Sequence, residues 1–191
     1  LILLDCNTLE YKLIPADFSP YKLLLLNTNV SHSLASSEYN VRRDECDIAL
    51  SAIQKKYPKY VSLAEIEPEV IEEFRQVLPE KVFNRALYVS EEQRRTRRAV
   101  QCLGQNDLKG FGDCLYGSHK GLRHMYDVSC KELDFLVDFS KNIEYVLGSR
   151  MMGGGFGGCT INLIHANKIE DFIEKAKTAY QDKFEMELSS I

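Results

Sequence analysis

The chain opens with two runs whose apolar positions indicate β-strands. Near the end of residues 1–14, apolar side chains alternate with polar ones at Leu9, Tyr11 and Leu13, a pattern typical of a half-buried strand. Residues 21–30 start with a denser apolar run, which indicates a more buried strand. The connecting residues 15–20 begin and end with proline, which favours a turn. We therefore expect the two runs to pair as antiparallel strands.

Helical spacing of apolar residues dominates the middle of the chain. A first helix is expected from near Glu38 to Lys56, because Pro58 would stop it. Three serines are each followed three residues later by glutamate or glutamine, a pairing that can satisfy two backbone donors at a helix start. With the proline and glycine breakers, these signals predict a helix start at Ser62 and four further helices: Pro68 to before Pro79, Ser90 to near Gly104, one from Asn106 or Asp107, and one from Ser129.

The C-terminal third combines both periodicities. A short strand is expected at Ile143 to Leu147, and a second at Cys159 to Ile164, with a glycine-rich loop between them. A final helix carries one apolar face made of Ile169, Phe172, Ile173, Ala176 and Tyr180. These elements predict an α+β fold in which antiparallel β-sheet layers are flanked by helices.

The loop between the two expected strands is the strongest chemical signal. Five of the six residues from Gly153 to Gly158 are glycine, the exception being Phe156. A P-loop would need a lysine and a hydroxyl residue after the glycines, and a dinucleotide fingerprint would open a helix, so neither pattern fits. Two interpretations stay open: backbone N–H groups that form a nest for an anion, and a tight turn under a neighbouring element.

Composition narrows the class of protein. The 191 residues are 45% hydrophobic and 27% charged, which is typical of a single globular domain. A net charge of -4 implies no general affinity for nucleic acid, and no apolar run reaches the roughly 20 residues needed to cross a membrane. Six cysteines without metal-ligand spacing predict reduced thiols in a cytoplasmic protein. Because the chain begins inside an expected strand, we expect it to be part of a longer polypeptide.

Two segments carry a resemblance to a known family. Residues 148–160, Gly-Ser-Arg-Met-Met-Gly-Gly-Gly-Phe-Gly-Gly-Cys-Thr, resemble the third conserved motif of the GHMP small-molecule kinases in its galactokinase form. Residues 27–43 resemble the galactokinase segment that follows the catalytic half. The resemblance implies that residues 1–191 form a single C-terminal domain with a ferredoxin-like element. That domain consists of a β-rich opening segment, 1–30, and a part comprising helices and the strand–loop–strand motif, 31–191.

The resemblance also implies a reaction. Galactokinases transfer the γ-phosphoryl group of ATP to the anomeric hydroxyl of α-D-galactose with Mg²⁺. The first two family motifs and the catalytic residues are not found in this chain, so the resemblance implies a missing N-terminal domain of the same protein as a partner and no catalytic residue here. It implies that Tyr39 binds galactose. It also places a loop near the nucleotide phosphates, consisting of Gly153, Gly154, Gly155, Phe156, Gly157 and Gly158.

Several features leave alternatives open. Tyr39 has a second interpretation as a core tyrosine. Met152 stands where the family usually has threonine, so one hydroxyl beside the loop is absent. Two further functions fit the same motifs: a non-catalytic sugar and ATP sensor, or a kinase for a different sugar. Among other polar residues, Arg42 and Arg43 are candidates to orient Tyr39, and Arg150 is a candidate to brace the loop by pairing with a carboxylate. A solvated helix face is expected for Arg94, Arg95, Arg97 and Arg98. Capped or surface roles are expected for His32, His119, His124 and His165.

Overall fold

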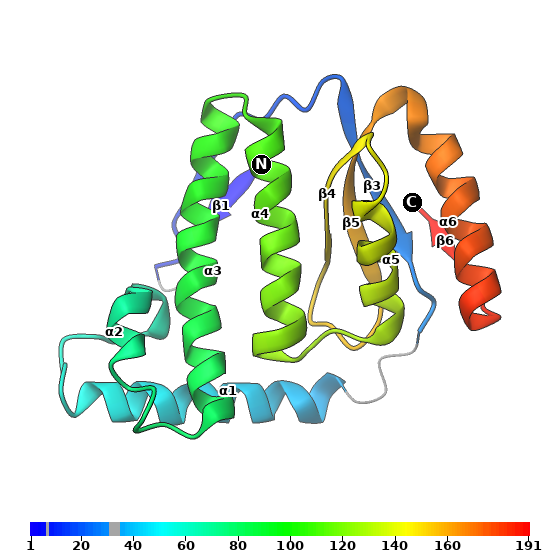
Figure 1. Cartoon of the computed structure of the whole chain (residues 1–191). Coiled ribbons are helices and arrows are strands. Elements are labelled where there is room, and N and C mark those ends of the chain that lie inside the picture. Colours follow the sequence, from blue (N-terminus) through cyan, green and yellow to red (C-terminus); the bar gives the residue numbers. More distant parts are fainter. Residues whose placement is uncertain (7, 31–34) are drawn as a thin grey trace.

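The computed structural model describes residues 1–6, 8–30 and 35–191, and it is built around a four-stranded antiparallel sheet (Figure 1). The strand order is β4-β5-β3-β6, with β3 at Tyr21–Asn27, β4 at Val146–Met151, β5 at Cys159–His165 and β6 at Ser189–Ser190. β3 pairs along its whole length with β5, from Tyr21 opposite His165 to Asn27 opposite Cys159. Helices α5 (Lys131–Lys141) and α6 (Ile169–Phe184) cover one face of the sheet and bury the alternate leucines of β3.

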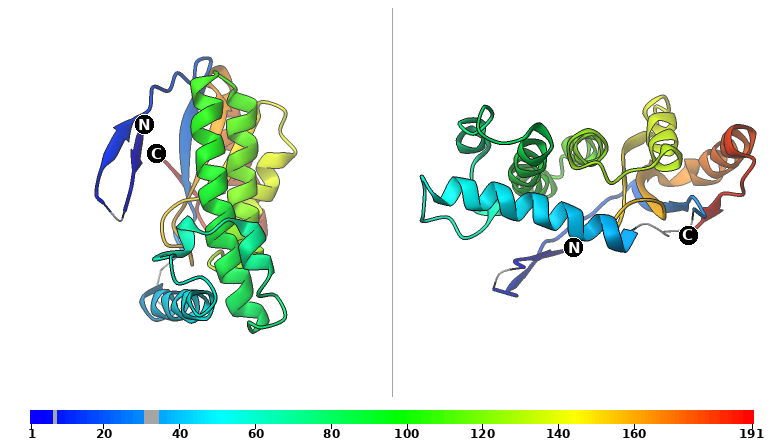
Figure 2. Two further views of the ribbon diagram at one scale, coloured as in Figure 1. Left: turned by 90° about the vertical axis from the view of Figure 1, so that its left-hand side faces the viewer. Right: turned by 90° about the horizontal axis from the view of Figure 1, so that it is seen from below.

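The remaining helices extend this layer away from the sheet. They are α1 (Ala35–Gln54), α2 (Pro68–Glu72), α3 (Glu80–Gly104) and α4 (Leu108–Gly121), with one-turn helices η1 (Leu63–Glu65) and η3 (Ala166–Lys168). α4 continues into a short π-helical turn, η2 (Leu122–Tyr126). α4 lies directly on β4 because glycines meet there: a Cβ on Gly112 would lie 2.1 Å from the carbonyl oxygen of Leu147. Helix α1 crosses the lower end of α3, and its first turn lies beside the loop that joins β4 to β5 (Figures 1 and 2).

The first fourteen residues behave differently from the expectation. They form their own hairpin, in which β1 (Ile2–Leu4) pairs with β2 (Tyr11–Leu13), and they do not pair with β3. The hairpin projects from the side of the sheet opposite the row of helices (Figure 2, right). Its apolar side chains are exposed, Leu9 by 74% and Tyr11 by 68%. Two predictions are therefore wrong: the opening runs do not pair with each other, and the first run is not half-buried. The physical reason is that β3 pairs with β5 instead.

Several boundaries of helices and strands predicted from capping residues and apolar spacing are wrong. Ser90 lies inside α3, where its hydroxyl donates to the carbonyl of Ile66, so it caps no helix. Ser62 makes no capping hydrogen bond, and the N-cap position of α5 is Cys130 instead of Ser129, also without a side-chain capping bond. The strand expected at residues 143–147 begins later, at Val146. The helix starts at Pro68 and Asp107, the strand at Cys159 and the apolar face of α6 are confirmed.

The structure also describes the cysteines and the apolar character of the helices. All six cysteines are free thiols, and Cys102 and Cys114 are buried. Among the residues that the structure describes, no helix is long and apolar enough to cross a membrane.

Candidate functional site

The glycine loop connects β4 to β5 with a backbone that most side chains disfavour. Gly153, Gly155, Gly157 and Gly158 have φ angles of 82°, 89°, 139° and 81°, and Phe156 has a φ of 60°. Such left-handed values are readily adopted by glycine alone, which explains the composition of the loop. Only Gly154 among the five glycines has an ordinary φ.

Four hydrogen bonds anchor the loop to its surroundings at three points. At its start, the Met152 N–H donates to the carbonyl of Cys159 (2.9 Å). In the middle, the Phe156 N–H donates to the carbonyl of Val128 (2.7 Å). At its end, the Gly158 carbonyl accepts from the Thr28 hydroxyl (2.8 Å) and backbone N–H (2.9 Å). The loop is therefore a fixed part of the fold.

Part of the loop is left open toward solvent. Gly153 and Gly154 are exposed, and a Cβ on either would meet nothing within 4 Å. Within the described residues, the N–H groups of Gly153, Gly154, Gly157 and Gly158 have no hydrogen-bond acceptor. Gly155 and Gly157 instead pass close to Val128 and Val30. The loop thus combines both sequence interpretations: it turns tightly under its neighbours, and it presents unpaired N–H groups of the kind that bind anions.

Tyr39 lies near the start of α1, the end of that helix that lies beside the loop (Figures 1 and 2). Its side chain is 65% exposed, so the alternative of a core tyrosine is wrong. Residues 31–34 of the same sequence motif, including His32, lie outside the described residues. An exposed phenol offers a donor, an acceptor and a flat apolar face, which suit a sugar hydroxyl and ring.

The two arginines that follow Tyr39 have different environments. Arg43 is exposed. Arg42 is 6% exposed and donates to two backbone carbonyls, those of Tyr126 (2.8 Å) and Asp127 (2.7 Å). It is thus bound to the end of η2, where helical carbonyls lack partners within the helix.

The capped or surface role expected for His119 is wrong, because its side chain is 1% exposed and lies against the end of β4. Its Nδ1 accepts from the N–H of Met151 (3.2 Å), and its Nε2 lies 3.2 Å from Asp134 Oδ1. Burial alone would raise the pKa of Asp134, but His119, Ser129 and Arg123 outweigh this effect and lower it. No metal-ligand spacing in the sequence marked this residue.

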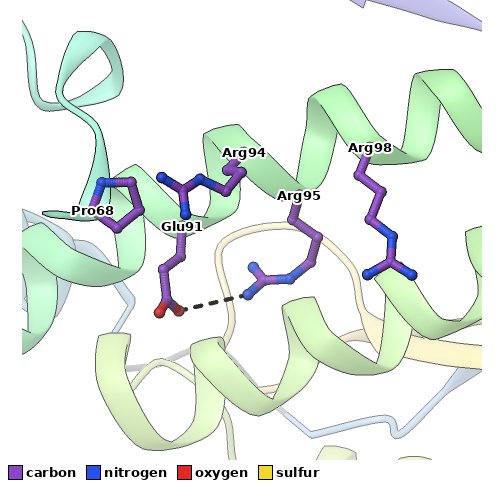
Figure 3. A pocket seen from close by; sticks show the side chains of 5 residues that line it. All are labelled: Pro68, Glu91, Arg94, Arg95 and Arg98. Carbon is purple, nitrogen blue, oxygen red and sulfur yellow. Dashed lines mark ion pairs between the residues drawn. The ribbon is translucent and has the colours of Figure 1, made fainter.

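The remaining polar candidates divide clearly. Arg150 Nη1 lies 3.4 Å from Glu92 Oε1, the expected pairing with a carboxylate beside the loop. A hollow of about 280 Å³ is lined by Pro68, Glu91, Arg94, Arg95 and Arg98, whose side chains are drawn in Figure 3. Its arginines are largely neutralised, since Arg94 pairs with Glu67 and Glu69, and Arg95 with Glu91 and Glu92. This helix face therefore agrees with the expected solvated surface.

Comparisons with known proteins place this geometry in a family. Residues 99–182 match the family model described as GHMP kinases C terminal. Galactokinase of Thermotoga neapolitana is 42% identical over 98% of this chain and 51% of its own length. Human galactokinase is 43% identical over 87% of this chain and 41% of its own length.

A solved structure agrees with the sequence relatives. The structure of Lactococcus lactis galactokinase complexed with galactose superimposes with a TM-score of 0.93 at 31% identity, covering 100% of this chain and 49% of that one. The chain spans about half the length of the curated relatives it matches. The chain therefore contains the C-terminal domain of the GHMP kinases, in a form homologous to the galactokinases over essentially its whole length.

Proposed function

We propose that this chain is the C-terminal part of a galactokinase, which transfers the γ-phosphoryl group of ATP to the anomeric hydroxyl of α-D-galactose. The observation that carries the proposal is the pair of open features at one end of the fold. Unpaired N–H groups of the glycine loop lie beside the helix start that presents Tyr39. Phosphoryl transfer depends mainly on positioning and on stabilising charge, and N–H groups of this kind serve both.

Each residue has a binding role in this proposal. The unpaired N–H groups of Gly153, Gly154, Gly157 and Gly158 donate to phosphate oxygens of ATP, and the Tyr39 hydroxyl binds galactose. Proton transfer from the sugar hydroxyl is assigned to residues outside this chain. Because Gly153 and Gly154 are the open part of the loop, they are the positions where added side-chain atoms would obstruct a phosphate first.

The proposed reaction also uses Mg²⁺, to which no residue of this chain is assigned. Among the described residues, no group of three or more His, Cys, Asp or Glu side chains is arranged to hold a metal ion. In this proposal Mg²⁺ accompanies ATP, and we assign no residue of this chain and no step to it. A cytoplasmic location is also part of the proposal, and it is supported by six cysteines that are all free.

The test is an assay of ADP formation by the full-length protein with ATP, Mg²⁺ and a panel of sugars. We expect galactose to be the preferred substrate and Tyr39→Phe to raise its KM. The 191-residue chain alone should form no ADP above a blank. Preference for an N-acetylated sugar would indicate a different sugar kinase. Binding of galactose and ATP without turnover by the full-length protein would indicate a sensor.

A further inference from the structure

The segment that follows α4 and η2 lies between the two binding elements proposed above. Helical carbonyls at a C-terminus have no partner within the helix and need donors from elsewhere. Here four consecutive carbonyls, from Met125 to Val128, all accept hydrogen bonds from other elements. The donors come from α3, from α1 and from the glycine loop.

Arg42 supplies two of these bonds from α1. It lies one helical turn after Tyr39, and its side chain is directed at the carbonyls of Tyr126 and Asp127. Its charge is balanced within the fold, because Glu38 lies 3.1 Å and Glu45 3.8 Å from its Nη1. A positive charge at a helix C-terminus is also favoured by the helix dipole.

The glycine loop contacts the next carbonyl of the same segment. The Phe156 N–H donates to Val128 at 2.7 Å. The approach is so close that a Cβ on Gly155 would lie 2.0 Å from the Val128 oxygen. Three successive residues, 126 to 128, therefore bind α1 on one side and the loop on the other.

We propose that Arg42 is a positioning residue that sets the spacing between Tyr39 and the glycine loop. The proposal rests on the proposed function, in which these two elements bind the sugar and the phosphates. Arg42 touches neither ligand in this proposal. It acts by holding the first turns of α1 against the carbonyls of Tyr126 and Asp127. The next carbonyl of the same segment, that of Val128, holds the loop.

The chemistry of the side chain makes the proposal specific. A guanidinium group donates through two nitrogens in a fixed plane, here Nε to Tyr126 and Nη2 to Asp127. A lysine would keep the charge beside Glu38 but offers a single nitrogen, so it cannot hold both carbonyls in the same plane. Arg42→Lys is thus the informative change, because charge balance is kept while the geometry is lost.

The experiment compares full-length Arg42→Lys with Arg43→Lys as a matched control. Arg43 is adjacent, exposed and without an ion pair among the described residues. Steady-state kinetics gives KM for galactose and for ATP, and hydrogen exchange follows the amides of residues 152–158. We expect Arg42→Lys to raise both KM values about tenfold and to speed exchange in the loop, with both properties unchanged in Arg43→Lys.

Non-additivity separates positioning from general destabilisation. Tyr39→Phe should raise the galactose KM less in the Arg42→Lys background than in the wild type, because the phenol is already misplaced. A lower Tm with unchanged KM values and unchanged loop exchange would overturn the proposal. Faster loop exchange in Arg42→Lys, combined with no galactose or ATP binding by the wild type, would support the connection between Arg42 and the glycine loop and reject the proposed function.

Discussion

Replacement of Gly155 by alanine tests how the glycine loop is held. Gly155 has a φ of 89°, and a Cβ there would lie 2.0 Å from the carbonyl oxygen of Val128. A left-handed backbone costs an L-residue roughly 1–2 kcal/mol. Ordinary contact begins at 3.4 Å, so the loop must also move away from Val128 and weaken the hydrogen bond from Phe156. Loss of a buried hydrogen bond adds roughly 1–3 kcal/mol.

The expected loss of unfolding free energy is therefore about 3 kcal/mol, which corresponds to a decrease in Tm of roughly 6–12 °C for a protein of this size. Urea denaturation followed by circular dichroism measures it. Two neighbouring glycines are matched controls, because a Cβ on either meets nothing within 4 Å. Gly153→Ala has only the left-handed φ of 82° to overcome, and Gly154→Ala, with an ordinary φ, should change stability by less than about 0.5 kcal/mol.

The order of the three variants carries the test. We expect Gly155→Ala to be the least stable, Gly153→Ala intermediate and Gly154→Ala closest to the wild type. If Gly155→Ala and Gly153→Ala were equally stable, the contact with Val128 would contribute nothing and the reasoning from close approach would be refuted.

Three further changes test other parts of the site. Burial raises the pKa of the Cys130 thiol to about 11, so at pH 8 only about one molecule in a thousand carries the thiolate; iodoacetamide should label exposed Cys6 first, and equal rates would contradict this. The lowered pKa of Asp134 means that its stabilising contribution is present above pH ~4, the ordinary value for an aspartate, and is lost as pH falls through the lower folded value. Asp134→Asn should thus be less stable than the wild type at pH 7, and the difference should shrink in acid; a constant difference would exclude this linkage. Met152→Thr in the full-length protein should change KM for ATP by less than about tenfold, because the Met152 N–H is already bonded to Cys159 and its side chain is 42% exposed; a larger change would assign the side chain a direct role.

The candidate site was only partly readable from the sequence. Motif resemblance selected Tyr39 and the loop from Gly153 to Gly158, and the structure places both at one end of the fold. It did not find the buried His119 at the end of β4. It also left Arg42 as a candidate to orient Tyr39, whereas its side chain is bound to carbonyls 84 and 85 residues away. Helical spacing places Arg42, unlike exposed Arg43, on the same face of α1 as buried Ala49 and Ile53, but it does not identify the carbonyls that Arg42 binds.

The sequence by itself determined those features that depend only on residues close together in the chain. A helical period of 3.6 and a strand period of 2 are properties of neighbouring residues, so the apolar face of α6 and the strand after the glycines were predictable. The need for left-handed backbone also follows from residue type, and it marked the loop.

Only the tertiary structure decided which distant segments meet. β3 pairs with β5, some 138 residues later, and this pairing leaves the opening residues as a separate exposed hairpin. Ser90 begins no helix, because the chain packs its hydroxyl against the carbonyl of Ile66. The glycine loop is fixed by Val128 and Thr28, which lie in other parts of the chain. Such contacts depend on the simultaneous burial of several elements, and no local pattern encodes that free energy.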